Sequence, residues 1–221
     1  MAVFNQDEVL KKLASQSVKQ GENLRNSVRE LTLQALTSRE LTLTQIKQVV
    51  SNITQGINVG AAESKMDPQK AVSDALAGLD EALLKAVQAS QVALQHFGAG
   101  KDFEQSQLKQ ALDDLERLED EFLSSVKQAS TNATDPIRQQ WAKVLKDAKM
   151  SGTGTGEQVT EAMEAFGKRM QAGMRESRAA GFKMAHMMTQ NFATLASGVL
   201  IGLSEALQQK GASKASKKRE S

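Results

Sequence analysis

The chain of 221 residues contains no cysteine, no tyrosine and only two prolines, and its aromatic content is 4%. The absence of cysteine excludes disulfides and thiolate metal sites, which suits a reducing compartment. Few aromatic side chains together with abundant alanine and glutamine are typical of long helices that pack through narrow apolar seams. The N-terminal residues show no apolar run of the kind that forms a secretory signal. We therefore expect a cytoplasmic, all-α protein.

The chain also has no large excess of charge of either sign, since the net charge is only +2. Residues 208–221 hold five basic and one acidic side chain, whereas the remaining residues hold 23 basic and 25 acidic ones. The basic balance thus comes from the tail, and we expect residues 210–221 to be disordered. A folded nucleic-acid-binding domain would need a basic stripe on its body, so the sequence disfavours a nucleic-acid partner.

Apolar residues recur at helical spacing along the N-terminal third. The first stripe begins at Val9 and Leu13 and continues through Leu24, Val28, Leu31 and Ala35. A second helix is predicted after a cap at Thr42 or Thr44, and Gly56 and Gly60 are expected to weaken its end.

The next two helices are predicted to form an antiparallel hairpin of about 68–97 with 102–130. Asp67 followed by Pro68 is a strong start signal, and the stripe that follows is Val72, Leu76, Leu79, Leu83, Val87, Ser90, Leu94 and Phe97. Residues 98–101 break the helix, and the short loop with matched helix lengths predicts that the arms fold back on each other. We expect the first stripe to face Leu108, Leu115 and Phe122.

The C-terminal half is predicted to contain a short helix, a linker and one long helix. Asp135 and Pro136 cap and open a helix that buries Ile137, Trp141 and Leu145. The glycines at 152, 154 and 156 predict a flexible linker near 149–156. The long helix, about 157–209, begins with Val159, Met163, Phe166, Met170 and Met174 on one stripe. Residues 1–209 are thus expected to form a single elongated helical domain, an elongated bundle that resembles a coiled coil.

The sequence offers no constellation that carries chemistry. The glycines of residues 152–156 follow no strand and lack dinucleotide-loop spacing. The acidic run over 113–121 is interpreted as a solvated face with partners such as Asp113 with Arg117, rather than a metal site. His96 and His186 stand apart from acidic residues at metal-binding spacing. We therefore predict no catalytic residues, no cofactor, no metal and no small-molecule substrate.

The richest signal lies near the C-terminus, where seven of nine methionines fall between Met150 and Met188. Residues 187–204 carry no charge and lead into the basic tail. This run fits a weak transmembrane span, a buried helix or a reversible surface anchor. The predicted contact residues are Met184, Met188, Phe192, Leu195, Val199 and Leu203, and the tail adds Lys210, Lys214, Lys217, Lys218 and Arg219.

Several segments are similar to an all-helical bacterial family of unassigned function: residues 28–60, 78–83, 108–112 and 118–123. The resemblance covers residues 25–207 and implies no activity and no site residues. In composition alone the chain also resembles phasins, the helical proteins that coat polyester storage granules. The shared features are abundant alanine and glutamine, the lack of cysteine, and a C-terminal tail of lysine, alanine and serine.

These patterns favour a non-catalytic surface-associating or scaffold protein that contacts a membrane or granule through residues 159–207. The alternative is a soluble oligomeric adaptor or regulator whose C-terminal helix is a subunit interface. Weak nucleic-acid association through the tail is a third hypothesis. In either of the first two cases we expect a homo-oligomer, because thin apolar seams are best buried by laying helices side by side.

Overall fold

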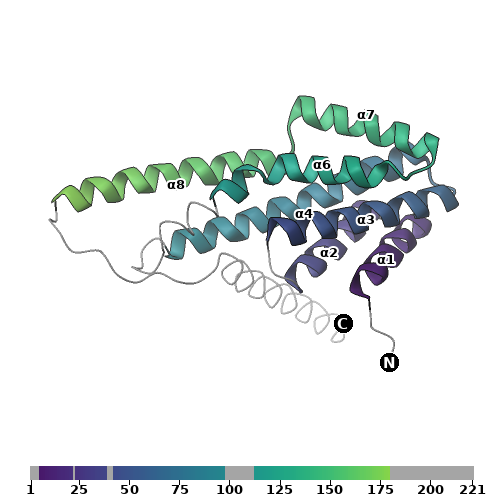
Figure 1. Ribbon diagram of the computed structural model, residues 1–221, viewed down its shortest axis with the longest axis horizontal. Helices are drawn as coiled ribbons and strands as arrows, with labels where there is room; N and C mark the ends of the chain where they lie inside the picture. Colours follow the sequence, from purple (N-terminus) through teal and green to yellow (C-terminus); the bar gives the residue numbers. More distant parts are fainter. Residues whose placement is uncertain (1–4, 22, 39–41, 98–111, 180–221) are drawn as a thin grey trace, which may run out of the picture.

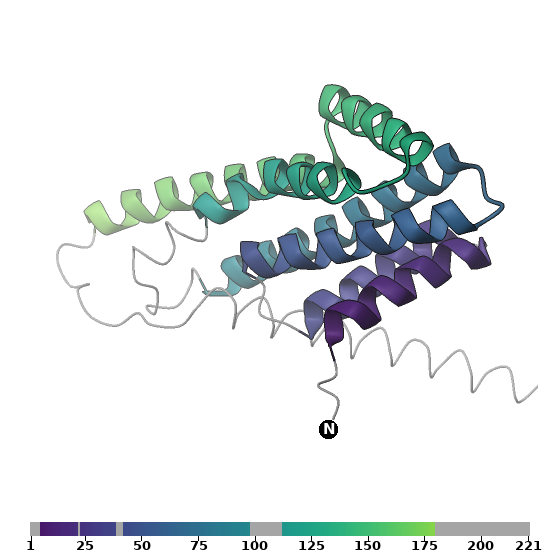
Figure 2. The same ribbon diagram turned by 45° about the vertical axis from the view of Figure 1, so that its right-hand side comes forward.

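The computed structural model describes residues 5–21, 23–38, 42–97 and 112–179. Within these ranges it contains seven α-helices and no strand, so the all-α prediction is confirmed. The helices form three layers (Figures 1 and 2). The outer layer on one side is α1 (Gln6–Gln20) and α2 (Leu24–Thr37), the middle layer is α3 (Leu43–Glu63) and α4 (Pro68–Phe97), and the opposite layer is α6 (Leu118–Ser130), α7 (Asp135–Ser151) and α8 (Gly154–Ala179).

The middle layer holds the centre of the core because helices cover it on both sides. α1 packs on α3 and α2 packs on α4, while α6 covers the other side of α3 and α7 and α8 cover α4. Ile53, Ile57, Leu79 and Leu83 are consequently fully buried. The stripe predicted for α4 is confirmed where its side chains are described, since Val72, Leu76, Leu79, Leu83 and Val87 are all buried.

The start signals of the middle layer also act as predicted. The Thr42 hydroxyl accepts the Gln45 N–H at 3.2 Å, which caps α3. The Asp67 carboxylate accepts the Lys70 N–H at 2.9 Å ahead of α4. Each bond satisfies an N–H that the first helical turn leaves without a partner.

The N-terminal stripe was predicted correctly in α2, where Leu24, Val28 and Ala35 are buried, but on the wrong face in α1. Helix α1 ends at Gly21, whose φ of 70° lies in the left-handed region, and α2 starts in a new direction after it. Val9 and Leu13 are exposed, and the buried face of α1 is formed by Leu10, Ala14 and Val18. The prediction drew one stripe through both helices and so ignored the change of direction at Gly21. This is why it placed Val9 and Leu13 on the buried face of α1.

Gly56 and Gly60 serve packing rather than marking the end of α3. A Cβ at Gly60 would lie 2.5 Å from the Ser15 carbonyl oxygen, and one at Gly56 would collide with the Lys11 carbonyl oxygen. α3 continues to Glu63, beyond both glycines. The two glycines therefore let the α1 and α3 backbones approach closely, as small residues do at close helix crossings.

The predicted pairing of α4 with the following helix differs from the contacts that the structure shows. Residues 98–111, which include the expected turn, lie outside the described residues. Helix α6 packs mainly against α3 and also contacts α7 and α8. A short loop requires the chain to turn back but does not select the partner, and α3 offers an apolar face of its own. Leu83, Leu115 and Phe122 still belong to one continuous core.

Helix α7 lies outside α4 and α6 and is fixed by its only tryptophan. Ile137 and Trp141 are buried as predicted, and Leu145 is partly buried. Asp135 is the first residue of the helix rather than its cap, since Thr134 holds the N-cap position. Pro136 stands in the first turn, where its missing N–H leaves no helical bond unmade.

Helix α8 packs only near its beginning. Val159 and Ala162 are buried and Met163 is partly buried against the core. Further on, a Cβ at Gly167 would meet no atom within 4 Å. Both views show α8 extending past the ends of the other described helices (Figures 1 and 2). Its described part ends at Ala179, so the predicted continuation to residue 209 lies outside the described residues.

Candidate functional site

The joint between α7 and α8 is held by several hydrogen bonds from helices that are distant in sequence. Only Gly152 and Thr153 separate the two helices. The Asp80 carboxylate of α4 accepts the Gly154 N–H at 2.8 Å and the Thr155 N–H at 2.9 Å. The Asp80 carbonyl accepts the Thr155 hydroxyl at 3.1 Å. A carboxylate suits this place because the first N–H groups of a helix lack partners and carry partial positive charge.

Glu119 of α6 holds the same joint from the other side. Its Oε1 accepts the Thr153 N–H at 3.1 Å and the Thr153 hydroxyl at 2.6 Å. The Thr153 hydroxyl oxygen in turn accepts the Gly156 N–H at 3.0 Å. A Cβ at Gly156 would collide with the Glu119 carboxylate, so a larger residue there would push this carboxylate out of its present position. We call Asp80, Glu119 and Thr153 the α8 anchor.

The α8 anchor replaces the flexible linker predicted for residues 149–156. Residues 149–151 complete α7 and residues 154–156 begin α8, so the linker prediction was wrong. Alternating glycine and threonine indicated conformational freedom, but the same small residues let two carboxylates reach the backbone. The acidic partners are distant in sequence, and nothing local in the chain points to them.

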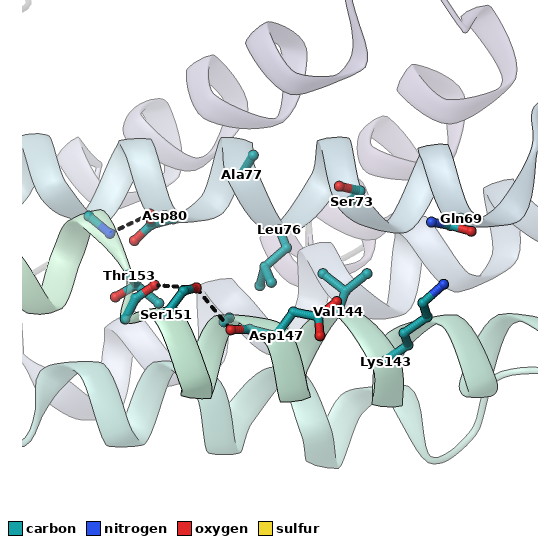
Figure 3. A pocket seen from close by; sticks show the side chains of 13 residues that line it. Gln69, Ser73, Leu76, Ala77, Asp80, Lys143, Val144, Asp147, Ser151 and Thr153 are labelled. Carbon is teal, nitrogen blue, oxygen red and sulfur yellow. Dashed lines mark hydrogen bonds between the residues drawn. The ribbon is translucent and has the colours of Figure 1, made fainter.

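A cleft of about 330 Å³ lies between α4 and α7, and Asp80 and Thr153 of the α8 anchor line it at one end (Figure 3). Its walls are apolar and its rim is polar. The walls include Leu76, Ala77, Val144 and Ala148, and the rim includes Gln69, Ser73, Lys143 and Asp147.

The lining of this cleft does not assemble a catalytic constellation. The Asp80 carboxylate already accepts two backbone N–H groups, and the Ser151 hydroxyl donates to the Asp147 carbonyl at 2.9 Å. Lys143 and Asp147 are exposed at the rim, where water solvates their charges. No histidine or cysteine lines the cleft. Its residues therefore provide neither an activated nucleophile nor a base held against one.

Two residues of the acidic run around α6 have described partners: Glu119 holds the α8 anchor, and Glu121 forms ion pairs. Glu121 pairs with Lys47 of α3 at 2.8 Å and with Arg117 at 3.0 Å. The hydrogen bond from Lys47, helped by the positive charges of Lys47 and Arg117, lowers the pKa of Glu121 below its ordinary value. Arg117 thus pairs with Glu121 rather than with the predicted Asp113. In the part of the chain that the structure describes, no three acidic or histidine side chains are grouped as metal ligands.

A second buried polar contact joins α3, α6 and α7. The Trp141 Nε1–H donates to Asn58 Oδ1 at 2.7 Å, and Asn58 Nδ2 donates to the Ala129 carbonyl at 3.0 Å. Trp141 is completely buried and Asn58 is 7% exposed. Sequence periodicity predicted the burial of Trp141 but gave no sign of its partner.

The predicted contact residues lie outside the described residues. These are Met184, Met188, Phe192, Leu195, Val199 and Leu203, together with Lys210, Lys214, Lys217, Lys218 and Arg219 of the tail. His186 and the uncharged run 187–204 also lie there, and the side chain of His96 is not described. Among the helices that the structure describes, none is long and apolar enough to cross a membrane.

Comparison with known proteins identifies the family and goes no further. No curated protein and no solved structure matches the chain. A family model does match, from residue 1 to residue 209, and it covers every described helix. The chain therefore belongs to that family, which is described as a family of unknown function (DUF6781).

Proposed function

We propose that the protein is a non-catalytic helical protein that associates with an apolar or anionic surface through α8 and the residues that follow it. On this proposal it is cytoplasmic and lies peripherally on a membrane or storage granule. The observation that carries the proposal is that α8 leaves the bundle after its first turns, with Gly167 already facing open space.

The sequence beyond the packed turns continues the same side of the helix. Val159 and Met163 face the core, and positions 166, 170 and 174 follow at helical spacing with Phe, Met and Met. Because α8 runs past the ends of the other described helices, an apolar side on this part of the helix favours contact with a surface outside the bundle. Methionine suits such a contact because its flexible thioether adapts to irregular apolar partners.

The α8 anchor supports this proposal mechanically. Asp80 and Glu119 come from two different helices and hold the first turn of α8 from two sides. The direction in which α8 leaves the bundle is therefore fixed by the body of the protein. A fixed arm presents its apolar side without first losing the conformational entropy of ordering a linker.

The test is flotation of the full-length protein with vesicles and with polyester particles. Changing Leu195, Val199 and Leu203 together to serine should abolish binding at every salt concentration, because the apolar contact is removed. Deleting residues 210–221 should weaken binding to anionic vesicles only, and should make the remaining binding less sensitive to salt. Circular dichroism of each variant shows whether the helices are retained.

The outcome against the proposal is equally specific. Wild-type protein that ignores vesicles and particles alike, but loses its oligomeric state in the triple serine variant, would identify the C-terminal helix as a subunit interface. The chain would then be the oligomeric adaptor of the alternative hypothesis.

A further inference from the structure

Helix α7 presents one face to the core and the other to solvent. Ile137 and Trp141 are buried, and Val144, Leu145 and Ala148 pack partly against the core. Both views place α7 on the outside of the bundle (Figures 1 and 2). Its outer face is therefore available to a partner, and changes there leave the core untouched.

This outer face is basic. Arg138, Lys143, Lys146 and Lys149 stand against Asp135 and Asp147, a net charge of +2 that no other described helix reaches. Arg138 is paired with Asp135. Lys143, Lys146 and Lys149 are exposed and form no ion pair with any residue that the structure describes. The basic balance of the chain comes from the tail, but α7 gathers four of the basic side chains of the body on one helix.

The three lysines form a compact patch. Steps of three residues shift each side chain by about 60° around the helix, so all three lie within about a third of its circumference. Met150, four residues after Lys146, falls on the same face and is 76% exposed. We call Lys143, Lys146, Lys149 and Met150 the α7 lysine face.

We propose that the α7 lysine face binds anionic lipid headgroups, as a second contact beside the C-terminal one. This inference rests on the proposed function and specifies its surface as an anionic bilayer. Lysine is a strongly hydrated point charge on a flexible stem, which suits a fluid headgroup layer better than a fixed bidentate partner. One exposed apolar side chain is too little to insert the helix, so the contact is peripheral and electrostatic.

The acidic residues of a second copy are a poorer match for this face. In α6, the most acidic described helix, the Glu119 carboxylate is engaged by Thr153. Glu121 is engaged by Lys47 and Arg117. Asp120 is the acidic residue of α6 that remains exposed without a described ion pair. Helix α6 of a second copy thus offers the α7 lysine face a single exposed carboxylate without a described ion pair, whereas an anionic bilayer offers many charges.

The experiment compares full-length proteins in flotation with phosphatidylcholine vesicles, with and without about one third phosphatidylglycerol. The test variant combines K143Q, K146Q and K149Q. The matched control combines K12Q, K65Q and K85Q, which removes the same charge at exposed lysines outside α7. We expect the test variant to bind anionic vesicles at least about tenfold more weakly, a factor that two lysines near such a surface can supply. The control should stay within about threefold of wild type, and neutral vesicles should not distinguish the proteins.

A label provides a second readout that does not depend on affinity. The chain has no cysteine, so M150C can carry an environment-sensitive dye at a single place. Its emission should shift to the blue with anionic vesicles, whereas the same dye on K85C should not respond.

The failures can be told apart. Wild type that binds no vesicle overturns the proposed function and this inference together. Wild type that binds, with the test variant equal to wild type or to the control, overturns only this inference. Loss of self-association in the test variant without any lipid binding would assign the α7 lysine face to a second copy instead.

Discussion

A carboxylate that accepts two backbone N–H groups at a helix start does more for stability than an exposed ion pair. The ion pair gains little in water, whereas the capping carboxylate satisfies donors that the helix itself leaves without partners. Asp80 is such a capping carboxylate, whereas Asp74, on the same helix, forms an ion pair with Lys70. The two residues therefore form a matched pair for measurement.

We predict that Asp80→Ala lowers the free energy of unfolding by about 1–2 kcal/mol. Asp74→Ala should lower it by less than about 0.5 kcal/mol. Urea unfolding measures both changes. Hydrogen exchange should also be faster at the Gly154 and Thr155 amides in the Asp80 variant, and equal effects of the two substitutions would contradict the capping role.

The single tryptophan allows a second measurement at this scale. Asn58→Ala removes the acceptor of Trp141 and the donor to Ala129 and leaves both groups buried without a partner. We expect a loss of about 1–3 kcal/mol in the free energy of unfolding. Tryptophan emission should change in the folded protein. Asn132→Ala, at an exposed position, should leave both quantities unchanged.

Glu121 makes the free energy of unfolding depend on pH in the acidic range. Its pKa is lowered in the folded protein, so its contribution is fully present above the ordinary value of 4.5 and is lost as the pH falls through the folded value. We predict that wild type loses more stability than Glu121→Gln between about pH 6 and about pH 3. Urea midpoints across this range test the difference. A parallel pH profile for the two proteins would exclude a contribution from the Lys47–Glu121 pair.

At the scale of elements, the crossing of α1 and α3 depends on missing side chains. Gly56 brings α3 against the Lys11 carbonyl, whereas Gly167 of α8 faces open space. Gly56→Ala should lower the free energy of unfolding by about 1–3 kcal/mol, because the helices must separate. Gly167→Ala should raise it by up to about 1 kcal/mol, because alanine favours the helix. Opposite signs in thermal or urea unfolding are the expected result, and a gain at both positions would show that the crossing is loose.

The sequence predicted elements best where a local signal was sufficient. Thr42 and Asp67 each cap a helix a few residues away, and the α4 stripe needs only one uninterrupted period. The sequence predicted the structure poorly where a residue distant in the chain determines how an element packs. The buried face of α1 depends on the turn at Gly21 and on the glycines of α3. The α7–α8 joint depends on Asp80, 74 residues before Gly154, and on Glu119, 34 residues before Thr153. Periodicity reports that a helix has an apolar side but does not name its partner.

At the scale of the whole molecule, α8 extends the protein beyond its bundle. We predict an oligomer or a markedly extended monomer, because α8 runs past the ends of the other described helices. Light scattering with small-angle X-ray scattering tests this. A monomer with a radius of gyration near ~17 Å, the value for a compact chain of this length, would contradict it.

The order in which the layers interlock has a consequence for synthesis. The main partner of α1 is α3, that of α2 is α4, and α6 returns to α3, so the largest contacts skip the neighbouring helix. A nascent chain that ends before Leu43 lacks α3 and leaves Leu10, Ala14 and Val18 of α1 without their main cover. Since non-local pairing is slow and exposed apolar faces attract other chains, α1 must stay without its main partner until α3 has left the ribosome, and α2 until α4 has.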